Sequence, residues 1–205
     1  MELLNTLTTG DFGACNGRGT GFYYTLDKLI ILFGGGQDKL THTLVYLGEQ
    51  VANQAGTDHL VFEADLVIKR TSISQTSVLH WYHWTDPLVQ HAMALALMDI
   101  MKAHDGDIYG AAQLPWFIWL WLVEKLKLPA RWAKHNIFLS GEICTGIVFL
   151  VLQRGVEYLK WFKYPQADQI NKIITANGRD YRSQRPVDIE QIGINLTKEG
   201  FTQQL

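Results

Sequence analysis

The sequence predicts an α+β protein in which a strand-rich first half precedes a helix-rich second half. Segments rich in β-branched and aromatic residues recur up to Trp84, whereas apolar residues recur with helical spacing from Asp86 onwards. Of the 205 residues, 47% are hydrophobic and 19% are charged, which is typical of a folded chain with a buried core. No repeat or linker divides the chain, so we expect a single domain over residues 1–205.

The first half is expected to contain several strands. The Gly-rich opening, Thr9–Gly21, indicates a strand end and turns. Phe22–Phe33 has the apolar spacing of a helix that ends at Gly34. The remaining segments have strand composition: Leu40–Gly48, His59–Asp65, Val67–Ser72 and Ser77–Trp84.

The second half is expected to contain three helices. The first is capped by Thr85 or Asp86, carries Pro87 in its first turn and ends at residues 104–106. The second, Leu114–Leu126, is rich in aromatic residues. The third, Gly141–Arg154, has a cap at Ser140 and a stop at Gly155. Because the third helix is apolar nearly all round, we expect it to be central.

The rest of the second half is expected to be less regular. The helix-rich region is predicted to span residues 85–165. The polar tail, residues 179–205, contains Arg185-Pro186 and is expected to form a surface loop with a short terminal element.

Charge and hydropathy exclude several classes of protein. The net charge of −2 gives no basic surface for nucleic acid. The N-terminal residues lack the basic and apolar regions of a signal peptide, and the longest apolar stretch, Trp116–Val123, is too short to span a bilayer. We therefore expect a cytoplasmic protein, or one carried inside a virus particle.

Three residues form a candidate catalytic set. Cys144 lies in the first turn of the third predicted helix, where the helix N-terminus lowers the pKa of a thiol. His42 lies within a predicted strand and Glu63 within the next one, so the two side chains can meet. Together they could act as nucleophile, base and orienting carboxylate. Each residue also has a non-catalytic explanation, because a lone Cys or His is commonly a core residue and Glu63 could face solvent.

Two other patterns are weak indications of a phosphate-binding loop and of a metal site. Gly17-x-Gly19-x-Gly21 lacks the remainder of a phosphate-binding loop and is read as a turn. His80 and His83 are three residues apart on a predicted strand, so they face opposite sides, and no Cys or Asp completes a metal site. We therefore expect neither a metal nor a cofactor.

Short motifs in a fixed order resemble the permuted NlpC-like (YiiX-like) families of the papain fold. Thr41–Gly48 (THTLVYLG) resembles their His-bearing strand, and Val61–Ala64 (VFEA) their Glu-bearing strand. Glu142–Gly146 (EICTG) lies where they carry the nucleophilic Cys. Further matches in the same order are Gly10-Asp11, Gly106-x-x-Tyr109 and Arg185–Ile189.

The resemblance implies a circularly permuted papain-like fold, with a small antiparallel sheet or barrel packed on a helical half. It also implies catalytic roles for Cys144, His42 and Glu63. The sequence departs from the families at Thr43, where an aliphatic residue is common, and at Thr145-Gly146, where Ser-Glu is common. Cys15 would suit the unpermuted order, but the residues after it do not open a helix, so we expect an unreactive thiol.

The function implied by the resemblance is thiol-dependent hydrolysis of an amide or peptide bond in bacterial peptidoglycan. Without a signal peptide, such an enzyme needs a carrier or a lysis route to the wall, and a phage tail or particle would supply one. One alternative is lipid-directed acyl transfer or (thio)ester hydrolysis, with helix 114–126 contacting lipid through Trp116, Trp119 or Trp121. A second alternative is a structural or interaction protein without catalytic activity.

Overall fold

The computed structural model has an α+β architecture built on a six-stranded antiparallel sheet with strand order β4-β3-β2-β1-β5-β6. It describes residues 7–16, 40–53, 56–64, 68–74, 78–105, 114–133, 144–181 and 184–205. The strands are β1 (Phe12–Asn16), β2 (Leu40–Asn53), β3 (Gly56–Ala64), β4 (Ile68–Ser74), β5 (Val78–Trp84) and β6 (Thr202–Gln204). The four predicted strands are thus confirmed, with shifted ends, while the predicted helix Phe22–Phe33 lies outside the described residues.

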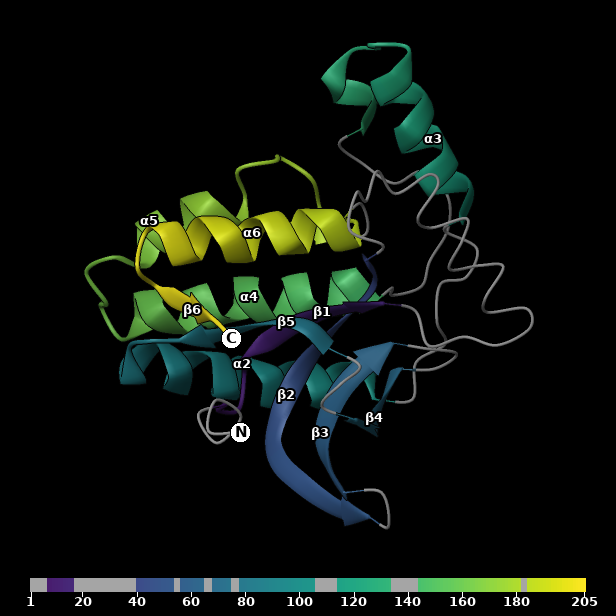
Figure 1. Cartoon of the computed structure of the whole chain (residues 1–205). Coiled ribbons are helices and arrows are strands. Elements are labelled where there is room, and N and C mark those ends of the chain that lie inside the picture. Colours follow the sequence, from purple (N-terminus) through teal and green to yellow (C-terminus); the bar gives the residue numbers. More distant parts are fainter. Residues whose placement is uncertain are drawn as a thin grey trace.

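The helices follow the strands along the chain, and Figure 1 shows α2, α4, α5 and α6 gathered beside the sheet, with α3 standing away from them. Asp86 caps α2, as predicted, by accepting a hydrogen bond from the Leu88 N–H at 2.7 Å. No described helix is long and apolar enough to cross a membrane. The helical elements are α2 (Pro87–His104), α3 (Leu114–Lys125), η4 (Ala130–Ala133), α4 (Cys144–Trp161), α5 (Ala167–Ile174) and α6 (Pro186–Lys198).

The strand β2 continues beyond Gly48, where the sequence predicted its end. Between the pairs Tyr46–Val61 and Gln50–His59, β2 has more residues than β3, so the strand bulges there. Gly48 has φ +85°, and a Cβ at this position would lie 2.1 Å from Thr9 Oγ1. Glycine is needed at this bulge because it tolerates both the left-handed backbone and the close approach.

The helix α4 is central, as predicted, but it does not end at Gly155. It runs on to Trp161, and its buried residues lie in one core cluster with those of α2, α5 and α6. A Cβ on Gly155 would lie 2.2 Å from Met93 Sδ on α2. Gly155 therefore permits close packing of two helices instead of ending one of them. The predicted cap, Ser140, lies outside the described residues.

The prediction of a surface loop in the tail was wrong, because residues 186–198 form α6 and residues 202–204 add β6 to the sheet. Ile189, Ile192 and Leu196 are spaced three or four residues apart and are all buried. Pro186 occupies the first turn, and the Asp188 carboxylate accepts a hydrogen bond from the Arg185 N–H at 2.9 Å. Polar residues on the exposed face concealed this apolar stripe in the sequence.

The sheet carries apolar side chains on both faces, in agreement with strand alternation. One face meets the helices through Phe12, Val45, Phe62 and Tyr82. The other face holds a smaller cluster that consists of Leu7, Cys15, Leu44, Tyr46, Val61 and Trp81. Cys15 and Cys144 are therefore buried in different clusters.

Asp11 joins the first described residues to the end of β5. Its buried carboxylate accepts hydrogen bonds from the Thr8 N–H at 2.7 Å, the Trp84 N–H at 3.1 Å and His83 Nδ1 at 2.8 Å. Burial raises the pKa of Asp11 above its usual value, although these hydrogen bonds act in the opposite direction. The Gly10-Asp11 motif is thus part of a polar junction inside the fold.

Replacing Asp11 with alanine is expected to lower the free energy of unfolding by about 3 kcal/mol. The substitution leaves buried hydrogen-bond donors of two segments without an acceptor. Urea denaturation measures the change. A matched control is Asp168→Ala, since Asp168 is an exposed residue paired with Lys160, and this variant should change stability by less than about 0.5 kcal/mol. Equal losses from both variants would contradict the junction's role.

Candidate active site

The structure brings Cys144, His42 and Glu63 together at the start of α4. His42 Nε2 donates a hydrogen bond to Glu63 Oε2 at 2.6 Å, joining β2 to its neighbour β3. Cys144 is the first residue of α4 and is buried in the same cluster as Val45 and Phe62 from these strands. The His42 side chain keeps 17% of its surface exposed, whereas Cys144 is 4% exposed.

A bulge in β2 lies beside His42. Cys15 on β1 pairs with His42, and the next residue, Asn16, pairs with Leu40, so Thr41 is an extra residue. Bulges redirect the neighbouring side chains and are common next to active sites. The bulge therefore lies directly before the residue that contacts Glu63 and Cys144.

The thiol and the imidazole favour each other's charged forms. Burial opposes ionisation of Cys144, but the adjacent His42 and hydrogen bonds from Thr43 lower the pKa of this thiol below its usual value. Burial likewise opposes protonation of His42, but Cys144 and Glu63 raise its pKa well above 6.5. Because Glu63 engages Nε2, we infer that Nδ1 is the ring nitrogen that interacts with the sulfur. The arrangement supports a thiolate–imidazolium pair near neutral pH.

Thr43 adds a buried hydroxyl group at a position where the families that the sequence resembles commonly have an aliphatic residue. Its side chain is fully buried, and its Oγ1 forms no hydrogen bond of ordinary geometry with the described residues. It nevertheless lies close enough to Cys144 to favour the thiolate, as does the Thr43 N–H. An aliphatic residue at this position would remove the hydroxyl donor and keep the backbone one.

Replacing Thr43 with valine, which has nearly the same shape, is expected to raise the pKa of the Cys144 thiol by about one unit, because the thiolate loses the nearby hydroxyl group that favours it. Thr43→Ser, which keeps the hydroxyl, should restore the lower value. The pH dependence of the ultraviolet absorbance of the thiolate reports the pKa of Cys144. An unchanged pKa in Thr43→Val would show that the hydroxyl plays no part.

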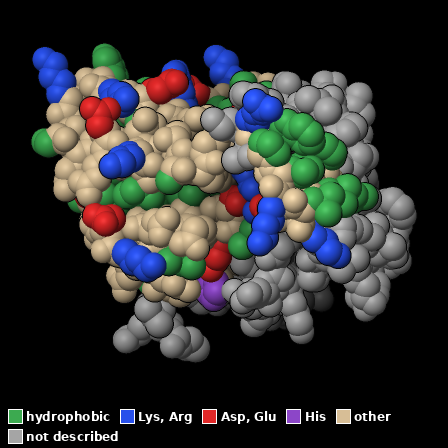
Figure 2. Space-filling model, turned by 90° about the horizontal axis from the view of Figure 1, so that it is seen from above, with side chains coloured by type: hydrophobic (Ala, Val, Ile, Leu, Met, Phe, Trp, Pro, Cys, Tyr) green, Lys and Arg blue, Asp and Glu red, His purple; other side chains and the backbone are tan. Residues whose placement is uncertain are grey.

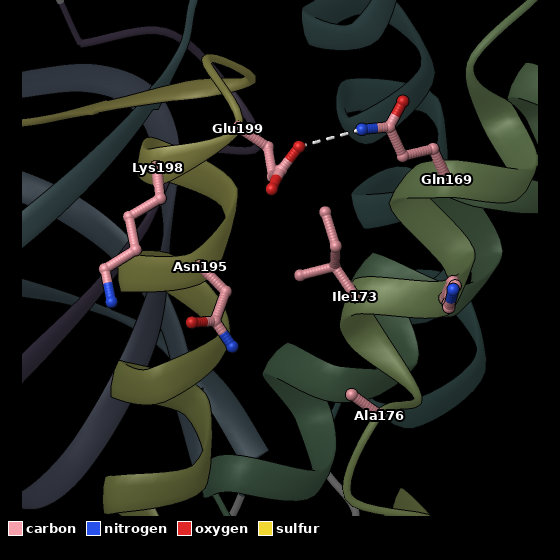
Figure 3. Close-up of a pocket in the computed structure, with 7 residues that line it drawn as sticks. Gln169, Ile173, Ala176, Asn195, Lys198 and Glu199 are labelled. Atoms are coloured by element: carbon pink, nitrogen blue, oxygen red, sulfur yellow. Dashed lines mark hydrogen bonds between the residues drawn. The ribbon is translucent and has the colours of Figure 1, made fainter.

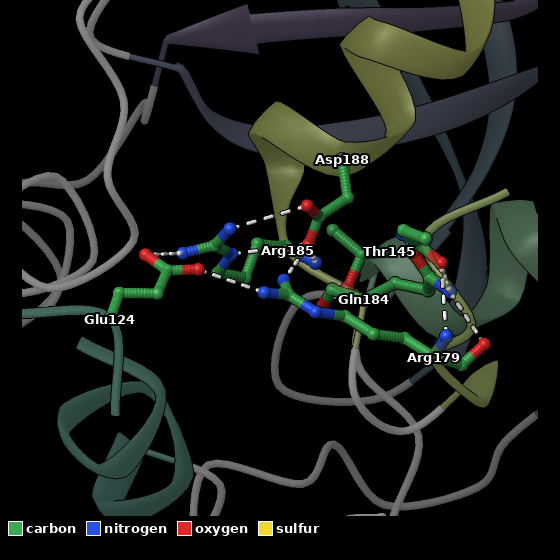
Figure 4. A network of polar contacts seen from close by, with 7 residues as sticks. Glu124, Thr145, Arg179, Gln184, Arg185 and Asp188 are labelled. Atoms are coloured by element: carbon green, nitrogen blue, oxygen red, sulfur yellow. Dashed lines mark hydrogen bonds and ion pairs between the residues drawn. The ribbon is translucent and has the colours of Figure 1, made fainter. Parts of the chain in front are cut away.

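A network of polar contacts holds the first turns of α4 and α6 together (Figure 4). Thr145 Oγ1 donates to the Gln184 carbonyl oxygen at 2.7 Å, directly beside Cys144. The next residue, Arg185, donates to Asp188 at 3.1 Å and to Glu124 of α3 at 3.0 Å. Burial acts to lower the pKa of Arg185, but these carboxylates raise it. No sequence signal pointed to Gln184, because it lies in the tail that was expected to be a loop.

The remaining candidate residues do not join this site. Cys15 is the strand partner of His42, but it is buried in the smaller apolar cluster, apart from the cluster that holds Cys144. His80 Nδ1 donates to Glu190 at 2.6 Å and His83 Nδ1 donates to Asp11 at 2.8 Å, so each histidine has a carboxylate partner of its own. The described residues contain no cluster of His, Cys, Asp and Glu that could hold a metal ion.

Several sequence motifs lie outside the described residues, namely Gly17-x-Gly19-x-Gly21, Gly106-x-x-Tyr109 and Glu142-Ile143. The side chains of Trp116 and Trp121 are outside them as well. Trp119 is described, and its ring stacks on Trp132 of η4 with centroids 5.9 Å apart.

A groove between α5 and α6 is separate from the candidate site (Figure 3). Its lining includes Ile173 and Ala176 from the α5 side and Asn195 and Lys198 from α6. Ten residues of α6 separate Lys198 from Asp188, which corresponds to about 15 Å along the helix. The lining of the groove includes none of Cys144, His42 and Glu63.

Comparisons with protein-family models, with curated proteins and with solved structures identify no match to this chain. The arrangement of side chains is therefore the basis for a functional proposal.

Proposed function

We propose that this protein is a thiol-dependent hydrolase with a permuted papain-like fold, in which Cys144 is the nucleophile. The observation that carries the proposal is the buried contact of Cys144 with His42, whose Nε2 is bound to Glu63 at 2.6 Å. The order of His, Glu and Cys along the chain, with Cys144 opening a helix packed on an antiparallel sheet, agrees with the permuted arrangement.

In the acylation step, the Cys144 thiolate attacks the substrate carbonyl carbon and forms a C–S bond. The backbone N–H groups at the start of α4 can stabilise the oxyanion. As the bond from carbonyl carbon to leaving group breaks, the His42 imidazolium donates its Nδ1 proton to the departing amine or alkoxide. Glu63 holds the ring in place and stabilises its charge.

In the deacylation step, neutral His42 accepts a proton from water through Nδ1. The resulting hydroxide attacks the thioester carbon, the C–S bond breaks, and the product acid leaves the Cys144 thiolate behind. Both steps use the same nitrogen, and the chemistry needs no cofactor.

The proposed substrate is an amide or peptide bond of bacterial peptidoglycan, and this part of the proposal rests on the sequence resemblance. A role as a phage particle component would bring such an enzyme to its substrate. Thiol chemistry of the same kind would also cleave an ester or thioester of a lipid. That second candidate is favoured by the exposed Leu126 and Trp132 at the end of the aromatic helix.

Digestion of purified peptidoglycan, followed by mass spectrometry of the released fragments, tests the proposal. Wild-type protein should release peptide or amide fragments, and Cys144→Ala should release none. Cys15→Ala is the matched control and should keep the activity. Equal release by wild type and Cys144→Ala would contradict the proposal, and cleavage of a lipid ester alone would select the second candidate.

A further inference from the structure

The end of α3 and the short helix η4 expose apolar side chains among basic ones. This surface, which we call the α3–η4 tip, comprises residues 125–132. Leu126 is 61% exposed and Trp132 is 45% exposed, and Lys127 and Arg131 beside them are exposed as well. Figure 2 shows apolar side chains flanked by Lys and Arg on this part of the surface.

The tip is held in one conformation by its own hydrogen bonds. The Leu126 N–H donates to the Leu122 carbonyl at 2.9 Å, and the Leu128 N–H donates to the Val123 carbonyl at 2.8 Å. Trp119 Nε1 donates to the Trp132 carbonyl at 3.0 Å, while the two indole rings stack. Leu126 and Trp132 thus stay exposed on a scaffold that is already formed.

The charge of the tip is positive. Glu124 is the only acidic residue between residues 114 and 133, and its carboxylate is bound by Arg179 at 2.9 Å and by Arg185 at 3.0 Å. Glu124 therefore does not offset the charges of Lys127 and Arg131. An indole and a leucine surrounded by basic residues suit the boundary between lipid headgroups and acyl chains.

Two apolar side chains elsewhere on the surface serve as a comparison for the tip. Trp161 is 75% exposed and Met98 is 64% exposed on α4 and α2. Two cations of α4, Arg154 and Lys160, are paired with acids, because Arg154 binds Asp99 at 2.8 Å and Lys160 binds Asp168 at 2.9 Å. Trp161 is thus more exposed than either apolar side chain of the tip, but acidic residues lie among the cations near it.

We propose that the α3–η4 tip docks on the surface of an anionic lipid bilayer. Leu126 and Trp132 enter the headgroup region, and Lys127 and Arg131 contact lipid phosphates. Glu124 directly precedes the tip, and the polar network of Arg185 and Gln184 joins it to Thr145. Docking would therefore hold the Cys144 end of α4 at a fixed place relative to the bilayer. The proposal stands independently of the proposed catalytic activity.

Co-sedimentation of the full chain with vesicles tests the proposal. The probes are vesicles of phosphatidylcholine alone and of phosphatidylcholine mixed with phosphatidylglycerol. We expect binding to the anionic vesicles only, with weaker binding at high salt. Lys127→Glu with Arg131→Glu should weaken binding by about tenfold or more, and Leu126→Ser and Trp132→Ala should each weaken it by about tenfold.

Trp161→Ala is the matched control and should bind like wild type. Thermal melting checks that every variant is folded, and Leu126→Ser keeps the test valid if Trp132→Ala disturbs the stacked pair. Absence of binding by folded wild type would overturn the proposal, as would an equal loss in Trp161→Ala. Self-association that disappears in Leu126→Ser, without vesicle binding, would overturn it in favour of a second copy of the chain.

Discussion

Replacing His42 with alanine is expected to lower kcat/KM of the proposed hydrolysis by about 10³- to 10⁴-fold, because the thiolate loses its counter-ion and the leaving group loses its proton donor. The measurement is the initial rate of fragment release from peptidoglycan by equal amounts of folded protein. Cys144→Ala should fall to the same residual rate, because the two residues act as one unit.

The matched control for this prediction is His91→Ala. His91 is an exposed histidine of α2 that stacks on Phe162, and it has no role in the proposed reaction. Its replacement should leave kcat/KM within about twofold of wild type. A His42→Ala protein that retains most of the activity would contradict the assignment of the base.

Replacing Glu63 with glutamine is expected to lower kcat by about 10³-fold and to narrow the pH range of activity. Glutamine has the size of Glu63 but no charge, so it no longer raises the pKa of His42. With a lower pKa, the imidazolium loses its proton at lower pH, and the alkaline limb of the pH–rate profile moves to lower pH. Profiles of kcat and of kcat/KM against pH measure the loss of rate and the shift of the alkaline limb.

The chain offers a matched control in its other histidine–glutamate pair. Glu190 accepts a hydrogen bond from His80 at 2.6 Å, so Glu190→Gln makes the same chemical change away from Cys144. It should leave the alkaline limb where it is in wild type. An alkaline limb that stays in place in Glu63→Gln would mean that Glu63 does not set the charge of His42.

Local sequence signals predicted much of the fold. The strands were identified from β-branched and aromatic composition, and the start of α2 from Asp86 and Pro87, because these signals depend on neighbouring residues only. The end of α4 was misplaced because the close approach of Met93 to Gly155, which explains the glycine, is a tertiary contact. The helix α6 was missed because its polar face dominated the composition of the tail.

The candidate site was predictable where adjacent strands define it. His42 and Glu63 lie on consecutive segments that pair as β2 and β3, so their meeting follows from a short hairpin. The contact of Cys144 with His42 joins residues that are far apart in sequence, and spacing alone could not predict it. Thr43 and Gln184 carried no sequence signal for a place beside Cys144, since their proximity depends on packing of α4 against β2 and α6.

The most direct test of the proposed thiolate–imidazolium pair is the rate at which limiting iodoacetamide labels Cys144 between about pH 5 and 9, a range that brackets an ordinary thiol pKa. The proposal predicts fast labelling of Cys144 near pH 6. At that pH, the labelling rate in His42→Ala should be about 10²-fold lower. Buried Cys15 should stay unlabelled, which peptide mass analysis checks. Labelling of Cys144 only above about pH 8 in wild type would contradict an activated thiol at this site.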